Sequence, residues 1–281
     1  MPENYRHWFT LVMQDATSKG GMGRSLLASQ TAFFFGLDET WARQHVIPLF
    51  TDPDRQKFAQ AWDGFLVRGR LYPALVEALM PAFLAAMSHA TDLHDRRRRF
   101  IEIYTALAVF HVFDPMQQLM PALFQHGSLE DQIAFASHLG HFLRQMQQPA
   151  KQQLWDGWLH HYWQDRLQGV LAVLKEAEIR KMLEWLLHLG DAFPDAVALA
   201  VRSPTIRIEH SHVLYELHKS ELVTRFPTET AELLIYLAAC TVDYHAADLA
   251  KVDARLPSIP TQLRGRVDEA FARAGVPRHR G

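Results

Sequence analysis

The residues most suggestive of chemistry form a glycine-rich segment near the start of the sequence. SKGGMGRS, Ser18 to Ser25, resembles a phosphate-binding loop of the KGGxGK[ST] type, with arginine at the final basic position. Such a loop holds a phosphate only when a preceding strand and a following helix aim its backbone amides. A short polar stretch separates the one candidate strand, Trp8 to Met13, from the glycines, and the sequence beyond is helical in pattern. We interpret residues 1–25 as an N-terminal extension with a glycine-rich linker, with Ser25 capping the next helix, and expect no cofactor.

Sixteen histidines raise the question of a metal site. Helical spacing brings Glu209, His212 and Glu216 to one face, where imidazole and carboxylate groups would suit zinc. The sequence has no HExxH motif and no cysteine pair to accompany them. We expect histidines scattered on helix surfaces, with no metal and no catalytic residue, and keep a metal-dependent hydrolase as an alternative function.

Four consecutive arginines, Arg96, Arg97, Arg98 and Arg99, stand where a long apolar helix begins. Cations at a helix N-terminus oppose the helix dipole, so these side chains require anions nearby. We favour carboxylates of the same fold, and the alternative is an anion site for phosphate or a nucleic-acid backbone. The chain has 29 basic and 31 acidic residues, so no overall field attracts nucleic acid or an anionic membrane.

A further candidate is the aromatic segment WLHHYWQDR, Trp158 to Arg166. Apolar and aromatic residues occupy nearly the whole circumference of this predicted helix, and a single buried stripe does not accommodate them all. We therefore expect at least one aromatic to be exposed or covered by another chain, with the alternative that a flanking helix covers the segment completely. The predicted partner-binding residues are Trp158, Tyr162, Trp163 and Arg166.

The motif WDGFL, Trp62 to Leu66, recurs as WDGWL, Trp155 to Leu159. Both tryptophans fall on apolar helical stripes, which predicts that they pack in the core. The glycine costs about 1 kcal/mol of helix propensity relative to alanine, a cost tolerated where two helices approach closely. The aspartates, Asp63 and Asp156, are expected to anchor Arg70 and Arg166 or the end of an adjacent helix. Because a catalytic site is rarely needed twice, we interpret the pair as a structural repeat.

The elements that position these residues are predicted to be helices throughout. Asp38, Asp52, Asp114 and Ser128 each precede an apolar-periodic run, two of them with proline at the first helical position. No series of alternating runs predicts a sheet. The single cysteine, Cys240, lies in an apolar run and is interpreted as a packing residue of a protein from a reducing compartment.

Repeats sharpen this expectation. LMPAFL at Leu79 returns as LMPALF at Leu119, and FPDAVALA at Phe193 resembles FPTETAELL at Phe226. The copies are separated by 40 and 33 residues, periods that are typical of repeats built from paired helices. We predict an all-α protein, an irregular α-solenoid or curved bundle of degenerate HEAT-like pairs, with residues 26–281 forming one helical-repeat domain. The lack of a signal peptide or a spanning segment predicts a cytoplasmic protein.

Ordered blocks from Leu26 to Leu249 resemble a bacterial helical domain of unknown function. These blocks are DETWARQHVIPLF, AWDGFLVRGRLYPALVEALMPAFL, LWDGWLHHYWQDRLQGV, MLEWLLHLGDAFPDAV and IEHSHVLYELHKSELVTRFP. That domain is associated with the C-terminal parts of larger proteins that carry sirtuin-like domains linked to antiphage defence. The resemblance implies a non-catalytic scaffold or recognition module that binds a protein partner, and it transfers no catalytic residue.

Overall fold

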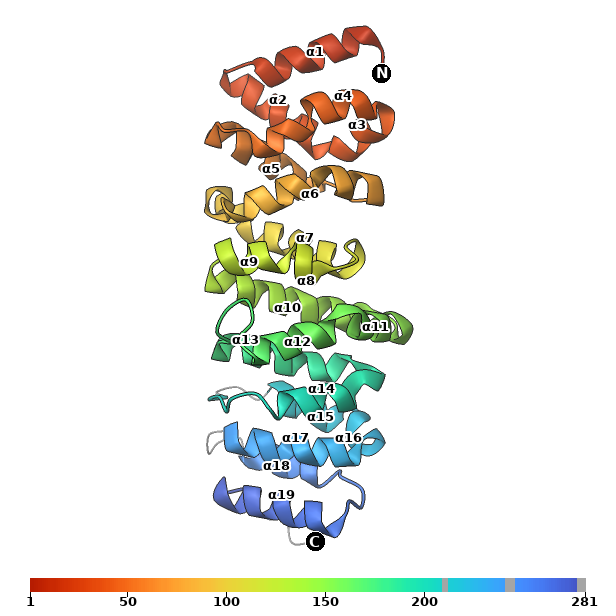
Figure 1. Cartoon of the computed structure of the whole chain (residues 1–281), viewed down its shortest axis with the longest axis vertical. Coiled ribbons are helices and arrows are strands. Elements are labelled where there is room, and N and C mark those ends of the chain that lie inside the picture. Colours follow the sequence, from red (N-terminus) through yellow and green to blue (C-terminus); the bar gives the residue numbers. More distant parts are fainter. Residues whose placement is uncertain (209–211, 241–245, 277–281) are drawn as a thin grey trace. The chain divides into compact units, whose positions relative to one another are not determined.

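The computed structural model describes residues 1–208, 212–240 and 246–276 (Figure 1). In these ranges the chain forms helices and no β-strand, so the predicted all-α class is confirmed. The segment Thr205 to Ile208, the best strand candidate, makes one isolated backbone bond, from Ile208 N to Cys240 O at 3.1 Å. The chain divides into two compact units, unit 1 (Met1–Phe135) and unit 2 (Ala136–Gly281).

Unit 1 contains the helices of the first half of the chain. They are α1 (Glu3–Gln14), α2 (Ser18–Ser29), α3 (Thr31–Leu37), α4 (Glu39–His45), η1 (Ile47–Thr51), α5 (Arg55–Arg68), α6 (Pro73–Met87), η2 (Ala90–Arg96), α7 (Arg97–Phe110), α8 (Pro115–Gln118) and α9 (Met120–His126), followed by the start of α10 (Leu129–Gln145).

Unit 2 contains the remainder of α10 and the helices after it. They are α11 (Gln148–Leu154), η3 (Trp155–Leu159), α12 (His160–Leu167), α13 (Glu176–Trp185), η4 (Leu186–His188), η5 (Gly190–Ala192), α14 (Phe193–Ala200), α15 (His212–Lys219), α16 (Leu222–Arg225), α17 (Pro227–Cys240), α18 (Ala246–Asp253) and α19 (Thr261–Arg273).

The predicted helix starts are mostly confirmed. The Asp38 side chain accepts from Trp41 N, and Asp114 accepts from Gln117 N with Pro115 in the first turn. The start expected at Asp52 lies two residues later, because Asp54 is the residue whose carboxylate accepts from the free amides of α5.

The glycine-rich segment is part of a helix, so the predicted linker is wrong. Helix α2 begins at Ser18, Thr17 supplies its N-cap, and the glycines lie within its first two turns. The Ser25 hydroxyl, expected to cap a helix, donates to Gln60 O at 2.9 Å. The glycines leave room for neighbours: a Cβ at Gly20 would meet the backbone of Asp15, and one at Gly23 would meet Val12 of α1.

Helices α2 and α5 lie side by side and run parallel (Figure 1). Gly21 faces the side chain of Gln60, and Gly64, one turn further along α5, faces the backbone of Ser25, one turn further along α2. A Cβ on Gly64 would overlap the Ser25 carbonyl, so this glycine permits the close approach expected from the WDG motif. Buried Arg24 fixes the pair by donating to Gln60 Oε1 at 2.9 Å.

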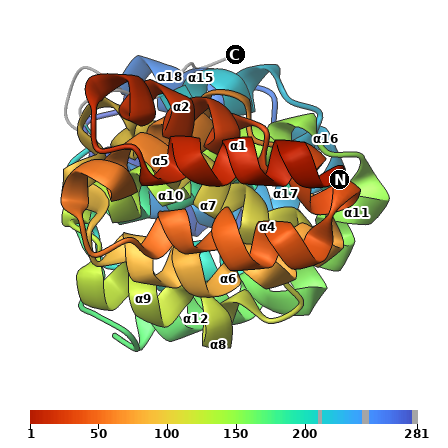
Figure 2. The same ribbon diagram turned by 90° about the horizontal axis from the view of Figure 1, so that it is seen from above.

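Helix α1 covers α2 and α4 at one edge of unit 1. Figure 2 shows α1 and α4 side by side, and the rings of Phe9 and Trp41 are 6.1 Å apart. Arg24 also donates to the carbonyls of Met13 and Asp15, at 3.2 and 2.5 Å, which ties the end of α1 to α2. The first 25 residues are therefore packed into unit 1.

Polar contacts recur at nearly constant sequence separation in each unit. In unit 1, Arg96 pairs with Asp63, 33 residues away, at 2.6 Å. In unit 2, Arg266 pairs with Glu232, 34 residues away, at 2.6 Å. Two further pairs have a separation of 34 residues, Arg97 with Asp131 and Arg225 with Asp191. Each pair joins two helical elements that are separated along the chain by at least one other helix.

The two WDG motifs lie in different backbone conformations. Trp62 lies in the α-helix α5, fully buried between Phe50, Phe83 and Phe100, and its indole N–H donates to Phe50 O at 3.1 Å. Trp155 begins the π-helical turn η3 and is also buried. The predicted packing of both tryptophans is confirmed. The expected close approach is absent at Gly157, since a Cβ there would meet nothing within 4 Å.

Candidate functional site

Two hollows border the parallel helices α2 and α5 of unit 1, one helical turn apart. We call the first the acidic pocket: it has a volume of about 510 Å³, and Ser25 and Asp63 line it. The second, the basic pocket, has a volume of about 650 Å³, and Ser29 and Arg68 line it. Because each helix contributes to both hollows, we treat this surface, the α2–α5 face, as one candidate site.

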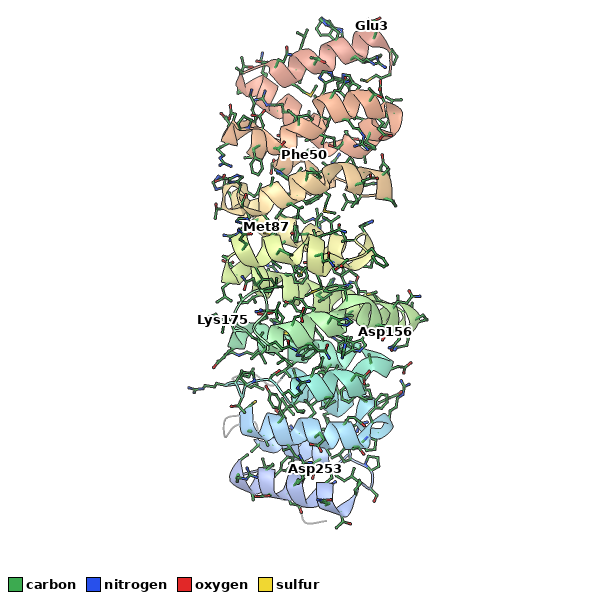
Figure 3. All side chains as sticks on the ribbon, viewed as in Figure 1. Glu3, Phe50, Met87, Asp156, Lys175 and Asp253 are labelled. Carbon is green, nitrogen blue, oxygen red and sulfur yellow. The ribbon has the colours of Figure 1, made fainter. Side chains whose placement is uncertain are left out.

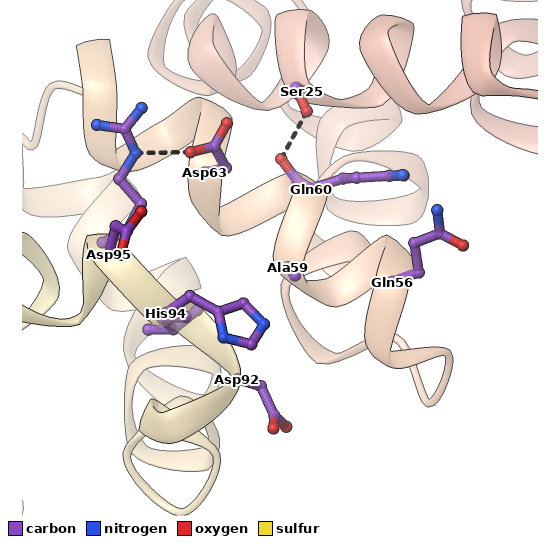
Figure 4. Close-up of a pocket in the computed structure, with 10 residues that line it drawn as sticks. Ser25, Gln56, Ala59, Gln60, Asp63, Asp92, His94 and Asp95 are labelled. Carbon is purple, nitrogen blue, oxygen red and sulfur yellow. Dashed lines mark hydrogen bonds and ion pairs between the residues drawn. The ribbon is translucent and has the colours of Figure 1, made fainter.

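The 92–96 segment of η2 closes the acidic pocket opposite α5 (Figure 4). His94 projects from this segment toward the space beside α5, and its backbone has φ 45°, which is unusual for a residue with a side chain. Two of the three carboxylates that line the pocket have internal partners: Asp63 pairs with Arg96, and Asp92 pairs with Arg55 at 3.3 Å. The negative charge of this pocket is therefore largely compensated within unit 1.

The basic pocket has a different charge balance. Ser29, Gln30, Ala32 and Phe33 line it with Arg68 and Arg70, and no carboxylate is among these residues. In the part of the chain that the structure describes, neither guanidinium has an ion pair or a hydrogen bond. Both arginines are exposed. This hollow therefore holds two uncompensated positive charges.

Exposed apolar side chains follow one another along α2 and α3 toward the basic pocket. Met22 is 64% exposed, Leu26, one turn later, is 68% exposed, and Phe33, at the pocket itself, is 60% exposed. Met22 and Leu26 stand one turn apart on the same face of α2, and Phe33 follows in α3, beyond Gln30, whose φ of −105° and ψ of 16° separate the two helices. We call these three residues the apolar strip.

The arginine run is mostly paired inside unit 1, as we favoured. Arg96 bonds to Asp63, and Arg97 bonds to the carboxylate of buried Asp131, with Nε to Oδ1 at 2.8 Å. Arg99 pairs with Glu102 at 2.6 Å. These carboxylates supply the anions that arginine side chains at a helix N-terminus require. The remaining arginine, Arg98, is exposed.

The metal candidates are only partly described. Glu209 lies outside the described residues. His212 and Glu216 stand one turn apart in α15, His212 exposed and Glu216 half-buried. Within the described ranges, no group of three or more histidine, cysteine, aspartate or glutamate side chains is arranged to hold a metal ion.

The exposure expected of the aromatic segment is wrong, and the alternative, a flanking helix that covers it, is confirmed. Trp158, Tyr162, Trp163 and Arg166 are all buried within unit 2. Tyr162 and Trp163 are adjacent, and Trp158 and Arg166 lie about one turn before and after them, so the buried face of the helix is wide. Helix α13 covers this face, since the ring of Trp185 lies 6.1 Å from that of Tyr162 and 5.8 Å from that of Trp163. These side chains are unavailable to a partner in this structure.

Arg166 belongs to a buried ionic network with Tyr162 and Glu178. Its Nε and Nη2 donate to the two carboxylate oxygens of Glu178 at 2.8 and 2.7 Å, and the Tyr162 hydroxyl donates to the same carboxylate at 2.9 Å. Burial and the Glu178 charge raise the pKa of Tyr162 well above its ordinary value. Burial opposes the charge on Arg166, but the bonds to Glu178 raise its pKa overall. Arg166 also donates to the carbonyls of Val170 and Ala172, so the network fixes the loop after α12.

The predicted aspartate anchors are confirmed in part: Asp63 holds an adjacent helix end, at Arg96, and the pairings with Arg70 and Arg166 are wrong. Asp63 pairs with Arg96 in place of Arg70, and Arg166 pairs with Glu178 in place of Asp156. Asp156 lies at the margin of unit 2 and accepts from Gln152 at 2.9 Å (Figure 3). Cys240 is buried, and burial raises the pKa of its thiol, which agrees with its interpretation as a packing residue.

Sequence reasoning missed the residues of the basic pocket. Arg68 is the last residue of α5 and Arg70 follows two residues later, whereas Phe33 lies in α3, and no motif connects them. A detectable signal was present in the apolar spacing of Met22, Leu26 and Phe33, which continues through a segment interpreted as a linker.

By length and composition, no single helix in the described part of the chain reaches across a membrane. Pro73–Met87 and Ala90–Phe110 have the required length and composition only when taken together, and this pair is bent by 101°.

Comparison with known proteins identifies the family. No match is found among curated proteins or among solved structures. A family model described as a domain of unknown function, DUF4020, matches residues 109–256, which is more than half of the chain. The matched region includes the second WDG motif, the buried ionic network and most of unit 2. This chain therefore belongs to the DUF4020 family of helical domains of unknown function.

Proposed function

We propose that this protein is a non-catalytic recognition module, built from irregular HEAT-like helical pairs, that binds a protein partner. The recurring separation of 33 or 34 residues between paired polar groups supports a repeat of helical pairs in each unit. The parallel course of α2 and α5, with α3 and α4 between them in the chain, also suits such an arrangement. Stacked pairs of this kind present one set of helices as a binding surface.

The apolar strip is the observation that carries the proposal. Three large apolar side chains, each more than half exposed, follow one another along α2 and α3. A stripe of this kind on a soluble protein marks a surface that another molecule covers, whereas single exposed apolar residues need no explanation. The two polar hollows beside the strip supply the polar rim that protein interfaces have.

The nucleic-acid alternative loses its main support in the structure. Three of the four arginines proposed to bind phosphate already pair with Asp63, Asp131 and Glu102. A guanidinium that leaves such a pair gives up a charge-assisted bond, which offsets what it gains from a phosphate. No corresponding observation favours the metal-dependent hydrolase.

The resemblance to domains of sirtuin-containing proteins is the basis on which we propose a biological role. We place the protein in bacterial antiphage defence, as the part that recognises a phage component or a nucleotide-related effector domain of the same system. The role assigned to this chain is recognition, and the reaction belongs to the effector.

Affinity capture from the native host tests the function. We expect a protein to co-purify with the tagged parent chain and with the control Val173→Glu, which changes an exposed residue of unit 2. That protein should be lost from the double variant Leu26→Glu/Phe33→Glu. Capture that is equal from all three chains, or that contains only nucleic acid, would reject recognition through the α2–α5 face.

A further inference from the structure

We propose that the basic pocket binds a carboxylate of an acidic, apolar partner segment, whose adjacent apolar side chain packs on Leu26 and Phe33. The inference rests on the proposed function and specifies the chemistry of the partner. It assigns Arg68 and Arg70 as the residues that recognise the carboxylate.

The positive charge of the basic pocket indicates an acidic ligand. Most exposed arginines of the protein have a carboxylate partner, including Arg43 with Glu39, Arg96 with Asp63 and Arg266 with Glu232. Arg68 and Arg70 share one hollow whose other lining residues are neutral. A guanidinium binds a carboxylate through two parallel N–H···O bonds, so two guanidiniums in one hollow suit an acidic ligand.

The position of Phe33 indicates that an apolar side chain lies next to the bound carboxylate. Its ring lines the same hollow as the two arginines, and it is 60% exposed. Phe34, the next residue, is buried and holds the Phe33 ring in a T-shaped contact at 5.5 Å. Leu26 is exposed on α2 about one turn before the pocket residue Ser29, so an apolar side chain next to the bound carboxylate has a surface to cover.

The acidic pocket favours a protein segment over a nucleic acid as the ligand. Asp63 stands five residues before Arg68 on α5, a rise of about 7.5 Å at 1.5 Å per residue. A DNA strand carries one phosphate per about 3.4 Å of helix axis, so a backbone that follows α5 would bring a phosphate next to the acidic pocket, where the Asp95 carboxylate has no cationic partner among the described residues. A short protein segment with one or two carboxylates avoids this repulsion.

Selection of peptides is the first part of the test. The probe is a random library of 12-residue peptides displayed on phage and selected on the parent chain. Peptides that bind the double variant Arg68→Gln/Arg70→Gln are removed before each round. We expect the enriched peptides to carry aspartate or glutamate next to a large apolar residue.

Affinity of the best peptide is the second part, measured by fluorescence anisotropy. We expect Kd to rise about ten-fold or more for each of Arg68→Gln and Arg70→Gln, since each removes hydrogen bonds to a charged group. Phe33→Ser should weaken binding as well. The matched control Arg202→Gln removes the same charge from an exposed position in unit 2 and should change Kd less than two-fold.

Thermal melts of each variant separate a lost site from a lost fold, and Arg68→Lys/Arg70→Lys provides a second control. The lysine variant keeps both charges without the forked geometry and should retain part of the affinity. Enrichment of peptides without acidic residues, or binding unaffected by the arginine changes, would overturn the inference while leaving the recognition function intact. Binding of single-stranded DNA, with no peptide enriched, would overturn both.

Discussion

The rings of Phe193 and Phe226 stack on each other in unit 2, with their centroids 5.7 Å apart and their planes at 27°. These residues occupy the same position in the two FP-containing repeats of the sequence, and each precedes the proline of a helix start. Beside the rings, Arg225 pairs with Asp191, 34 residues away. A similarity seen only in the sequence therefore corresponds to a direct contact between the starts of helices α14 and α17 of unit 2.

Trp62→Ala and Trp155→Ala are expected to destabilise the protein by about 3–5 kcal/mol each, because each leaves a large cavity in a buried cluster. Urea denaturation measures the change. The control Trp8→Ala removes an indole that is 63% exposed and should change the free energy of unfolding by less than about 0.5 kcal/mol. Parent-like unfolding of the Trp62 or Trp155 variant, together with loss of partner binding, would mean that WDG is a functional motif.

The two WDG glycines provide a matched pair of substitutions. Gly64→Ala places a methyl group against the Ser25 carbonyl, so we expect a loss of about 1–3 kcal/mol. Gly157→Ala meets nothing within 4 Å and gains helix propensity, so stability should rise by up to about 1 kcal/mol. Equal effects of the two changes, measured by urea denaturation, would show that α2 and α5 do not pack as closely as described.

Arg166→Met should destabilise unit 2 by about 3–5 kcal/mol, because it leaves the buried Glu178 carboxylate without its cation. Adding Glu178→Gln removes that charge and keeps an acceptor for Tyr162, so the double variant should recover part of the loss. A thermodynamic cycle of the two single variants and the double variant measures the coupling. Strictly additive effects would contradict a direct ion pair.

Stability should fall as the pH drops below about 6.5, the ordinary pKa of histidine. Burial, with added repulsion from Lys151 and Arg144, lowers the pKa of His188. Of the other groups that face it, His212 lowers the pKa further and Glu216 raises it. The unfolded chain therefore binds a proton at a higher pH than the folded one, so stability rises with pH between the folded and unfolded pKa values.

His188→Gln should flatten part of this dependence in urea denaturations at successive pH values, while the exposed control His161→Gln should not. Part of the slope should remain, because burial also lowers the pKa of His111. An unchanged pH profile for His188→Gln would show that this histidine does not contribute.

The all-α class and many helix starts were predictable because they depend on local chemistry. Asp38 and Asp114 cap helices through bonds to amides three residues away, and the spacing is visible in the sequence. The role of Gly21 in α2 was not predictable, since Gln60, which it faces, is about forty residues further on, and a glycine-rich segment by itself suggests a linker.

The same limit applies to the candidate site. The excess of aromatic residues in α12 was visible, but Trp185, which covers Tyr162 and Trp163, lies in another helix. The basic pocket joins Phe33 to Arg68, and their proximity follows from the parallel packing of α2 and α5. Contacts of this kind depend on helix pairing, which a single sequence does not specify.

Site-specific photo-cross-linking in the native host tests the recognition of a protein through the α2–α5 face most directly. A photoreactive phenylalanine is placed at Leu26 or at Phe33, and the control position is Phe113, which is fully exposed elsewhere in unit 1. We predict that Leu26 and Phe33 cross-link to one protein and that Phe113 does not. Equal cross-linking from all three positions, or cross-links to nucleic acid alone, would contradict the account.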